Sequence, residues 1–215
     1  MFSKIFPKIH AEGYKFLVIA GIITIVLYSF SDFLGLIGFV FTIWVYYFFR
    51  DPERVIIEDD SYLVSPADGE VIKVEEVDGP KELGLESKKF KKISIFMNVF
   101  DCHVNRTPCG GKIEEILYKP GKFFNASLDK ASEDNERNYF KIKDPQNNDV
   151  IVVQIAGLIA RRIVCETNKD QELKQGDRIG MIRFGSRTDV YYENYEPLVK
   201  VGQKSISGET LLAKK

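Results

Sequence analysis

The chain has 215 residues, of which 45% are hydrophobic and 28% charged, and a length of this kind suits one globular domain plus a small additional segment. The formal net charge of -1 excludes a general nucleic-acid binder, which normally carries a basic excess. The three cysteines (Cys102, Cys109 and Cys165) are an odd number without a secretory context, so no disulfide framework is expected.

Two long apolar runs lie near the N-terminus. Residues 16–31 and 33–49 contain no charged side chain, and Asp32 alone separates them. As helices, each run would be about 25 Å long, slightly short of a hydrocarbon core of about 30 Å. We therefore expect a basic segment at residues 1–15 and a helical hairpin at residues 16–50, either transmembrane or re-entrant. A buried hairpin of a soluble protein and a cleaved signal peptide fit less well.

Basic residues flank both ends of this hairpin. Lys4, Lys8 and Lys15 precede it, and Arg50 and Arg54 follow it. By the positive-inside rule, this pattern puts both ends on the cytoplasmic side of the cell membrane. The domain that follows is expected on the same side.

After residue 55 the sequence favours short strands. Apolar and polar residues alternate, β-branched residues are frequent, and Gly-acid turns recur. The expected strands cover residues 91–100, 110–118, 137–144 and 149–157, with a strand-turn-strand unit at residues 64–74. We therefore predict a mainly β domain at residues 51–215, a sandwich or barrel-like arrangement of short strands.

Few side chains indicate catalysis by themselves. His10 lies in the basic N-terminal segment, whereas His103 follows an apolar strand next to Asp101. A Cys-His hydrolase is not favoured, because adjacent Cys102 and His103 on a strand would point to opposite faces. A zinc site at this position would lack a fourth ligand and a CxxC pair, so no metal is expected. Asp68 is most simply a turn residue.

Several fragments in a fixed order point to one family. They are "FFRDPER", "SPADGEV", "FMNVFDCHVNRTP", "YKPGKF", "NERN", "QIAGLIARRI" and "MIRFGSRTDVY". Together they closely resemble the short, pyruvoyl-dependent form of phosphatidylserine decarboxylase. Each fragment alone is a weak signal, but the ordered set is specific and covers nearly the whole chain.

The resemblance implies a proenzyme that cuts itself between Gly185 and Ser186. The products would be a β chain of residues 1–185 and an α chain of residues 186–215. Ser186 would become a covalent pyruvoyl group, the cofactor, which reacts with the amine of membrane phosphatidylserine. The implied products are CO2 and phosphatidylethanolamine, with no metal and no diffusible cofactor.

The resemblance also implies supporting residues. Asp68 matches the aspartate of the family's "ADG" turn, and His103 matches the first histidine of a strand-end motif. Arg106 stands where longer members have a second histidine. We expect His103 to act as acid and base, with Asp68 orienting it. Arg183 and Arg187 either hold the lipid phosphate or are solvated strand residues.

Two alternatives remain open. One is an archaetidylserine decarboxylase with the same mechanism, because no residue in the sequence reads the glycerol stereochemistry. The other is a membrane-anchored biotinyl-like or lipoyl-like binding module, although no lysine stands at a hairpin tip between apolar residues. The sequence also leaves open whether the chain forms a homo-oligomer.

Overall fold

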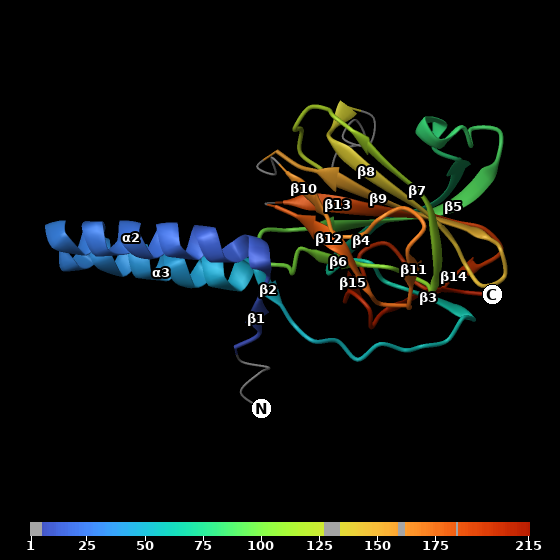
Figure 1. Ribbon diagram of the computed structural model, residues 1–215. Coiled ribbons are helices and arrows are strands. Elements are labelled where there is room, and N and C mark those ends of the chain that lie inside the picture. The colour runs from blue at the N-terminus through green and yellow to red at the C-terminus, as the bar shows by residue number, and fades with distance from the viewer. Residues whose placement is uncertain (1–5, 127–133, 159–161, 184) are drawn as a thin grey trace. The chain divides into compact units, whose positions relative to one another are not determined.

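The computed structural model describes residues 6–126, 134–158, 162–183 and 185–215 (Figure 1). The chain divides into two units, Met1–Glu53 and Arg54–Lys215. Apolar helices occupy the first unit and short strands dominate the second, which confirms the predicted mainly β class.

The first unit is a helical hairpin. Helices α2 (Tyr14–Phe30) and α3 (Asp32–Phe48) are joined at Ser31, and its hydroxyl caps α3 by accepting from the backbone N–H of Phe33. The hydroxyls of Thr24 and Thr42 lie 2.9 Å apart across the two helices. The helical stretch Ala11–Phe30 is long and apolar enough to cross a membrane, whereas α3 is shorter. The remaining short elements are β1 (Lys8–Ile9), η1 (Ala11–Gly13) and β2 (Arg50–Asp51).

The second unit is built from short strands and one 3-10 turn. Its elements are β3 (Tyr62–Val64), β4 (Gly69–Asp78), η2 (Lys81–Leu83), β5 (Lys89–Met97), β6 (Val104–Arg106), β7 (Gly111–Lys119), β8 (Arg137–Lys143), β9 (Asp149–Ala156), β10 (Ile163–Cys165), β11 (Glu172–Leu173), β12 (Arg178–Ile182), β13 (Ser186–Tyr192), β14 (Glu196–Pro197), β15 (Lys204–Ser205) and β16 (Leu211–Lys214). These bounds match the predicted strands to within a few residues.

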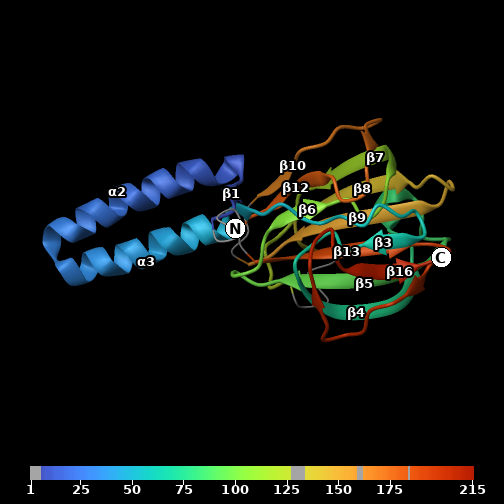
Figure 2. The same cartoon turned by 90° about the horizontal axis from the view of Figure 1, so that it is seen from below.

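Most of these strands form one curled antiparallel sheet of eight (Figure 2). Its order is β11-β7-β8-β9-β13-β5-β4-β15, so β13 lies in the interior between β9 and β5. Two three-stranded sheets, β10-β12-β6 and β14-β16-β3, complete the domain. Because β13 is paired on both sides, its backbone is held by two ladders of hydrogen bonds.

The two faces of the large sheet are both covered, and side chains alternate between them. On β13, Val190 and Tyr192 join the main core, and we call this side the Ser186 face. Tyr191 packs against a second apolar cluster on the opposite side, which we call the Arg187 face. The second cluster consists of Phe90, Tyr139, Ile151, Val153 and Ile155.

One predicted strand ends earlier than expected. The alternation of apolar residues predicts a strand over residues 91–100, but β5 ends at Met97. The next residues form a tight turn, in which the Asp101 carboxylate accepts from the Asn98 backbone N–H at 2.9 Å. The Asn98 side chain in turn accepts from the Phe100 backbone at 2.8 Å. Such side-chain-to-backbone bonds compete with the ladder and stop the strand.

Candidate active site

Ser186 is the first residue of β13 and lies inside the domain. Its residue is 0% exposed, and it is in register with Met97 of β5 and Ala156 of β9. The hydroxyl oxygen lies 3.9 Å from the Met97 sulfur. Pairing on both sides fixes the backbone of Ser186, so its side chain has a defined position in the core.

Gly185 supplies the turn that leads into this strand. Its φ is +62°, in the left-handed region that favours glycine. Gly157, just after β9, packs against the Gly185 carbonyl. A Cβ placed at residue 157 would lie only 2.1 Å from that oxygen, so the close approach requires glycine. The Gly185 carbonyl is therefore held by close packing against Gly157, and Ser186 is held by strand pairing.

His103 reaches the same peptide segment from the loop before β6. Its residue is 0% exposed, and the Gly185 backbone N–H donates to its Nε2 at 3.3 Å. Nδ1 lies 3.0 Å from the Asp101 carbonyl oxygen. Because Nε2 accepts, the proton of a neutral imidazole must sit on Nδ1, from which it is donated to that carbonyl. The Nε2 lone pair then points at the Gly185–Ser186 region.

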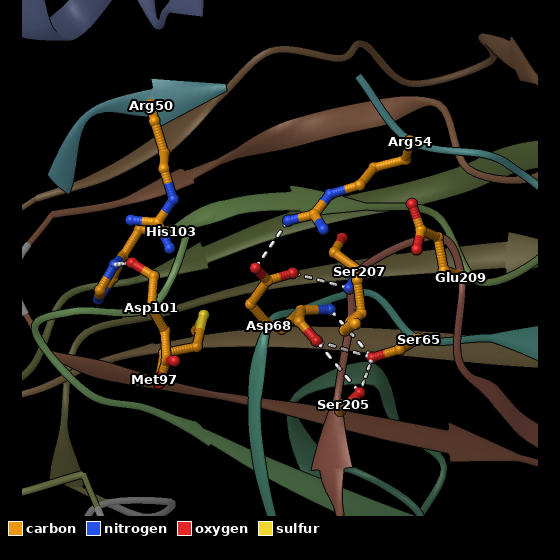
Figure 3. Close-up of polar contacts among 12 residues, drawn as sticks. Arg50, Arg54, Ser65, Asp68, Met97, Asp101, His103, Ser205, Ser207 and Glu209 are labelled. Carbon is orange, nitrogen blue, oxygen red and sulfur yellow. Dashed lines mark hydrogen bonds and ion pairs between the residues drawn. The ribbon is translucent and has the colours of Figure 1, made fainter. Parts of the chain in front are cut away.

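Asp68 is held in a separate polar cluster (Figure 3). Its carboxylate pairs with the Arg54 guanidinium at 2.7 Å and accepts from the Ser207 backbone N–H at 2.8 Å. Burial works against the charge of Arg54, but Asp68, Cys102 and Glu209 together outweigh it, so the pKa of Arg54 is raised. Neither contact of Asp68 is with His103, so its predicted role in orienting the imidazole stays a prediction.

One β6 residue contacts the same sulfur as the serine. Asn105 lies 3.6 Å from the Met97 sulfur through its amide nitrogen, and its oxygen accepts from Gln154 at 2.9 Å. Arg106, which stands in place of the second family histidine, donates to the Gly176 carbonyl at 2.9 Å. The sequence drew attention to Arg106, whereas the geometry places Asn105 beside the sulfur that Ser186 contacts.

Arg187 differs from both of its sequence interpretations. Its residue is 0% exposed, and its guanidinium forms a two-point ion pair with Asp189 at 2.6 and 2.7 Å. A third bond joins it to the Ser94 hydroxyl at 3.1 Å. Arg187 is therefore neither solvated nor directed at a lipid phosphate. Arg183 is also buried, which excludes a fully solvated side chain there.

A small apolar cavity adjoins Gly185. It has a volume of about 270 Å³, and Gly185 forms part of its wall. The remaining lining residues are Phe96, Asn98, Val99, Asn125, Ala126 and Leu158. The peptide bond before Ser186 can therefore be approached through an opening that is mostly hydrophobic.

Other chemistry has less support at this site. Burial raises the pKa of the Cys109 thiol, which disfavours the thiolate that a cysteine nucleophile needs. Within the ranges that the structure describes, no group of three His, Cys, Asp or Glu side chains is placed to hold a metal ion.

Comparisons with known proteins agree with this geometry. The family model of phosphatidylserine decarboxylase matches residues 41–213. The chain belongs to the phosphatidylserine decarboxylase family. It is 78% identical over 215 residues to the phosphatidylserine decarboxylase proenzyme of Pelagibacter ubique, covering 100% of both chains. The proenzyme of Ruegeria pomeroyi is 54% identical over 205 residues, covering 95% of this chain and 94% of the relative.

Family membership makes the chain a decarboxylase. Sequence reasoning missed two features of the site. Gly157 stood inside the fragment "QIAGLIARRI" without a role, and Asn105 stood beside the more conspicuous Arg106. A glycine directly after an apolar strand was the one available signal for a close backbone approach.

Proposed function

We propose that the chain is a proenzyme that cleaves itself between Gly185 and Ser186 and then decarboxylates phosphatidylserine to phosphatidylethanolamine. One observation carries this proposal. A buried serine follows a left-handed glycine, and the Nε2 of His103 accepts a hydrogen bond from that glycine at 3.3 Å. Membership of the decarboxylase family and relatives that are named proenzymes support it.

Self-cleavage needs a nucleophile, a base and an accessible carbonyl. The Ser186 hydroxyl attacks the Gly185 carbonyl carbon while the Nε2 of His103 takes the hydroxyl proton. The C–N bond between the two residues then breaks, the nitrogen takes the proton, and an ester joins them through the serine oxygen. Loss of the Cα proton and cleavage of the Cβ–O bond release residue 185 as a carboxylate. Water then replaces the nitrogen of residue 186, which leaves as ammonia.

The residues around position 186 fit the ketone that results. A pyruvoyl group there would react with the amine of a serine headgroup. It would then accept the electron pair that remains on the substrate carbon when CO2 departs. The burial of residue 186 limits how much water surrounds the reacting atoms, while the hydrolytic steps need only single water molecules. His103 holds a proton donor or acceptor nitrogen beside the same segment, so we assign to its Nε2 the proton that returns to the product carbon.

The two chains are expected to stay together after the cut. Residues 186–215 contribute β13 between β9 and β5, β15 beside β4, and β16 beside β3. All of these partner strands belong to residues 1–185. Removing the α chain would break ladders in two sheets at once, so we expect separation only under denaturing conditions.

The test is the mass of the purified protein under denaturing conditions. An uncut chain has a mass of 24.6 kDa, whereas the proposal predicts two fragments that separate on a denaturing gel. The variant Ser186→Ala is expected to remain one chain and to release no CO2 from phosphatidylserine. Ser61→Ala, at an exposed serine, is the matched control and should be cut normally. A wild-type chain that stays intact would overturn the proposal.

We further propose that residues 16–50 hold the enzyme at the cell membrane, with the domain of residues 51–215 on the cytoplasmic face. Many apolar side chains of the two helices are exposed, among them Ile25 at 72% and Phe30 at 76%. Such surfaces are unfavourable in water and favourable in lipid. Protease treatment of inverted membrane vesicles should digest the domain, and digestion only from the opposite side would contradict the orientation.

A further inference from the structure

Three loops converge at the end of the sheet where Ser186 begins β13. Met97 and Ala156 are in register with Ser186, so β5 and β9 end where β13 starts. The turn after β5, the segment at residues 123–126 and the turn after β9 all line the cavity beside Gly185. The cavity thus opens between loops that surround the reacting position.

These loops expose large apolar side chains to the outside. Phe100 is 62% exposed, Leu158 is 65% exposed and Phe124 is 40% exposed. Val99 and Leu158 line the cavity, while Phe100 and Phe124 are the chain neighbours of lining residues. We call Val99, Phe100, Phe124 and Leu158 the apolar collar. Exposed apolar residues that gather around a cavity typically mark a site of interaction.

The opposite end of the same strands has a different surface. At the start of β5, Lys89 and Asp78 form an ion pair, and their side chains are 78% and 61% exposed. Lys88 bridges Asp149 and Glu193 nearby. The two ends of β5 therefore differ, with a charged end at Lys88 and Lys89 and an apolar end at the collar. This asymmetry favours a partner that is itself apolar.

The reacting position narrows the identity of that partner. Residue 186 is 0% exposed, so a substrate must pass through an opening to reach it. The cavity that touches Gly185 offers a largely apolar path. At the collar, the Lys122 ammonium lies 5.6 Å from the centre of the Phe124 ring and also pairs with Asp134 at 3.7 Å, so charged groups stand at the edge of the apolar side chains. An apolar surface with a polar edge matches a phospholipid layer, in which acyl chains lie beneath charged headgroups.

We propose that the apolar collar inserts into the acyl region of a phospholipid surface and that the adjoining cavity receives the glycerol and upper acyl part of one lipid. This inference rests on the proposed function, since it assumes that the headgroup reacts at residue 186. It adds a second lipid-binding surface, which lies within residues 54–215 and is distinct from the N-terminal hairpin. Its substrate consequence is a preference for lipid in a bilayer over dispersed lipid.

The single tryptophan of the chain, Trp44, makes a direct test practical. In a Trp44→Phe background, Phe100→Trp and Leu158→Trp each place one fluorophore in the collar. Lys89→Trp is the matched control, because it places the fluorophore at the other end of β5. Each full-length protein is reconstituted into phosphatidylglycerol–phosphatidylcholine vesicles with or without brominated acyl chains. Bromine quenches only fluorophores that contact it closely.

We expect severalfold quenching at positions 100 and 158 and little at position 89. A second measurement compares wild type with the double variant Phe100→Ser, Leu158→Ser. The ratio of kcat/KM for vesicle phosphatidylserine to that for a monomeric short-chain phosphatidylserine should fall about tenfold, because two apolar side chains no longer enter lipid. The position 158 variant keeps the test valid if the position 100 variant does not fold.

The outcomes separate this inference from the proposed function. If wild type decarboxylates phosphatidylserine but positions 100 and 158 are quenched no more than position 89, the collar does not enter lipid and the inference fails. Collar residues that cross-link to a second copy without lipid quenching also overturn it. If wild type neither cuts itself nor releases CO2, the proposed function fails whatever the quenching shows.

Discussion

The two faces of β13 carry different chemistry. On the Ser186 face, Ser186 and Thr188 are small neutral side chains that lie above an apolar core. On the Arg187 face, Arg187 and Asp189 form a buried ion pair, and Arg187 also donates to the hydroxyl of Ser94 on β5. Ser186 and the Arg187–Asp189 ion pair therefore lie on opposite faces of one sheet, and both belong to a strand that is paired on both sides.

This division has a consequence for the cut chain. Cleavage would turn residue 186 into a chain end, and chain ends normally fray. Arg187 is the next residue, and its bonds to Asp189 and Ser94 hold it to its own strand and to β5. We infer that the Arg187 face is what keeps the new terminus in place after the bond is broken.

The largest expected effect comes from breaking the Arg187–Asp189 ion pair. Asp189→Asn would leave the buried Arg187 charge without its counterion, so we expect the free energy of unfolding to fall by about 3–5 kcal/mol. Urea unfolding in detergent, measured in a Ser186→Ala background so that every sample is one chain, gives the value. Lys204→Ala removes an exposed ion pair with Glu70 and should cost less than about 1 kcal/mol. If the two variants lose the same free energy of unfolding, the buried Arg187–Asp189 pair has no special role in stability.

Next to Ser186, the close contact between Gly157 and the Gly185 carbonyl can be tested by adding one methyl group. Gly157→Ala would place a Cβ where it meets that oxygen at 2.1 Å, so the carbonyl must move. A displacement of this size is expected to slow self-cleavage about 100-fold. The rate is read from the appearance of the smaller fragment after synthesis in a cell-free system.

The matched control for this substitution is Gly110→Ala. A Cβ at residue 110 would lie 3.5 Å from its nearest neighbour, which is an ordinary contact. This variant should therefore cleave at the wild-type rate. Wild-type cleavage in Gly157→Ala as well would show that the carbonyl tolerates the added group and that the contact does not position it.

The Arg187 face also predicts a dependence on pH. Burial alone would raise the pKa of Asp149, but bonds from Lys143 and Lys88 and the charge of Lys141 outweigh it, so the pKa is lowered. A carboxyl with a lower pKa in the folded state stabilises the fold fully above its unfolded pKa of about 3.9 and loses this contribution as pH falls through the folded pKa. Asp149→Asn should cost about 2 kcal/mol at pH 7 and much less in acid.

Unfolding curves of wild type and Asp149→Asn at several pH values measure this difference. Asp170→Asn is a suitable control, because the pKa of Asp170 is also lowered, by Lys112, but its side chain is 62% exposed. Little stability should depend on that exposed pair. A difference between wild type and Asp149→Asn that stays constant from neutral to acid pH would show that ionisation of Asp149 is not its source.

The sequence predicted the strands well because alternation of apolar residues is a local property. It also singled out Ser186 and His103 as candidate site residues, since both stand in fragments that resemble the decarboxylase family, and the structure places His103 beside Gly185. It did not reveal the state of Arg187, because a sheet that is covered on both faces buries charged residues that a one-sided sheet would leave in water. The Arg187 guanidinium also donates to Ser94, which is a residue of another strand.

The partners of Asp68 show the same limit. They are Arg54 and the backbone of Ser207, which lies 139 positions further along the chain. No local pattern predicts such a contact. The contact of Gly157 with Gly185 likewise exists only because β9 and β13 are neighbours in the sheet. Elements were thus predictable from nearby residues, whereas the geometry of the site required the topology.

The smallest expected effect concerns Thr188, which lies on the Ser186 face two residues after Ser186. Its hydroxyl is buried, and no hydrogen-bond partner for it is found among the residues that the structure describes. Because an unsatisfied buried hydroxyl costs free energy, Thr188→Val should leave the free energy of unfolding unchanged or raise it by up to about 1 kcal/mol. The same urea titration in the Ser186→Ala background measures it. If the free energy of unfolding falls by more than about 1 kcal/mol, the Thr188 hydroxyl is hydrogen-bonded in solution. The Ser186 face would then be held by polar contacts, as the Arg187 face is.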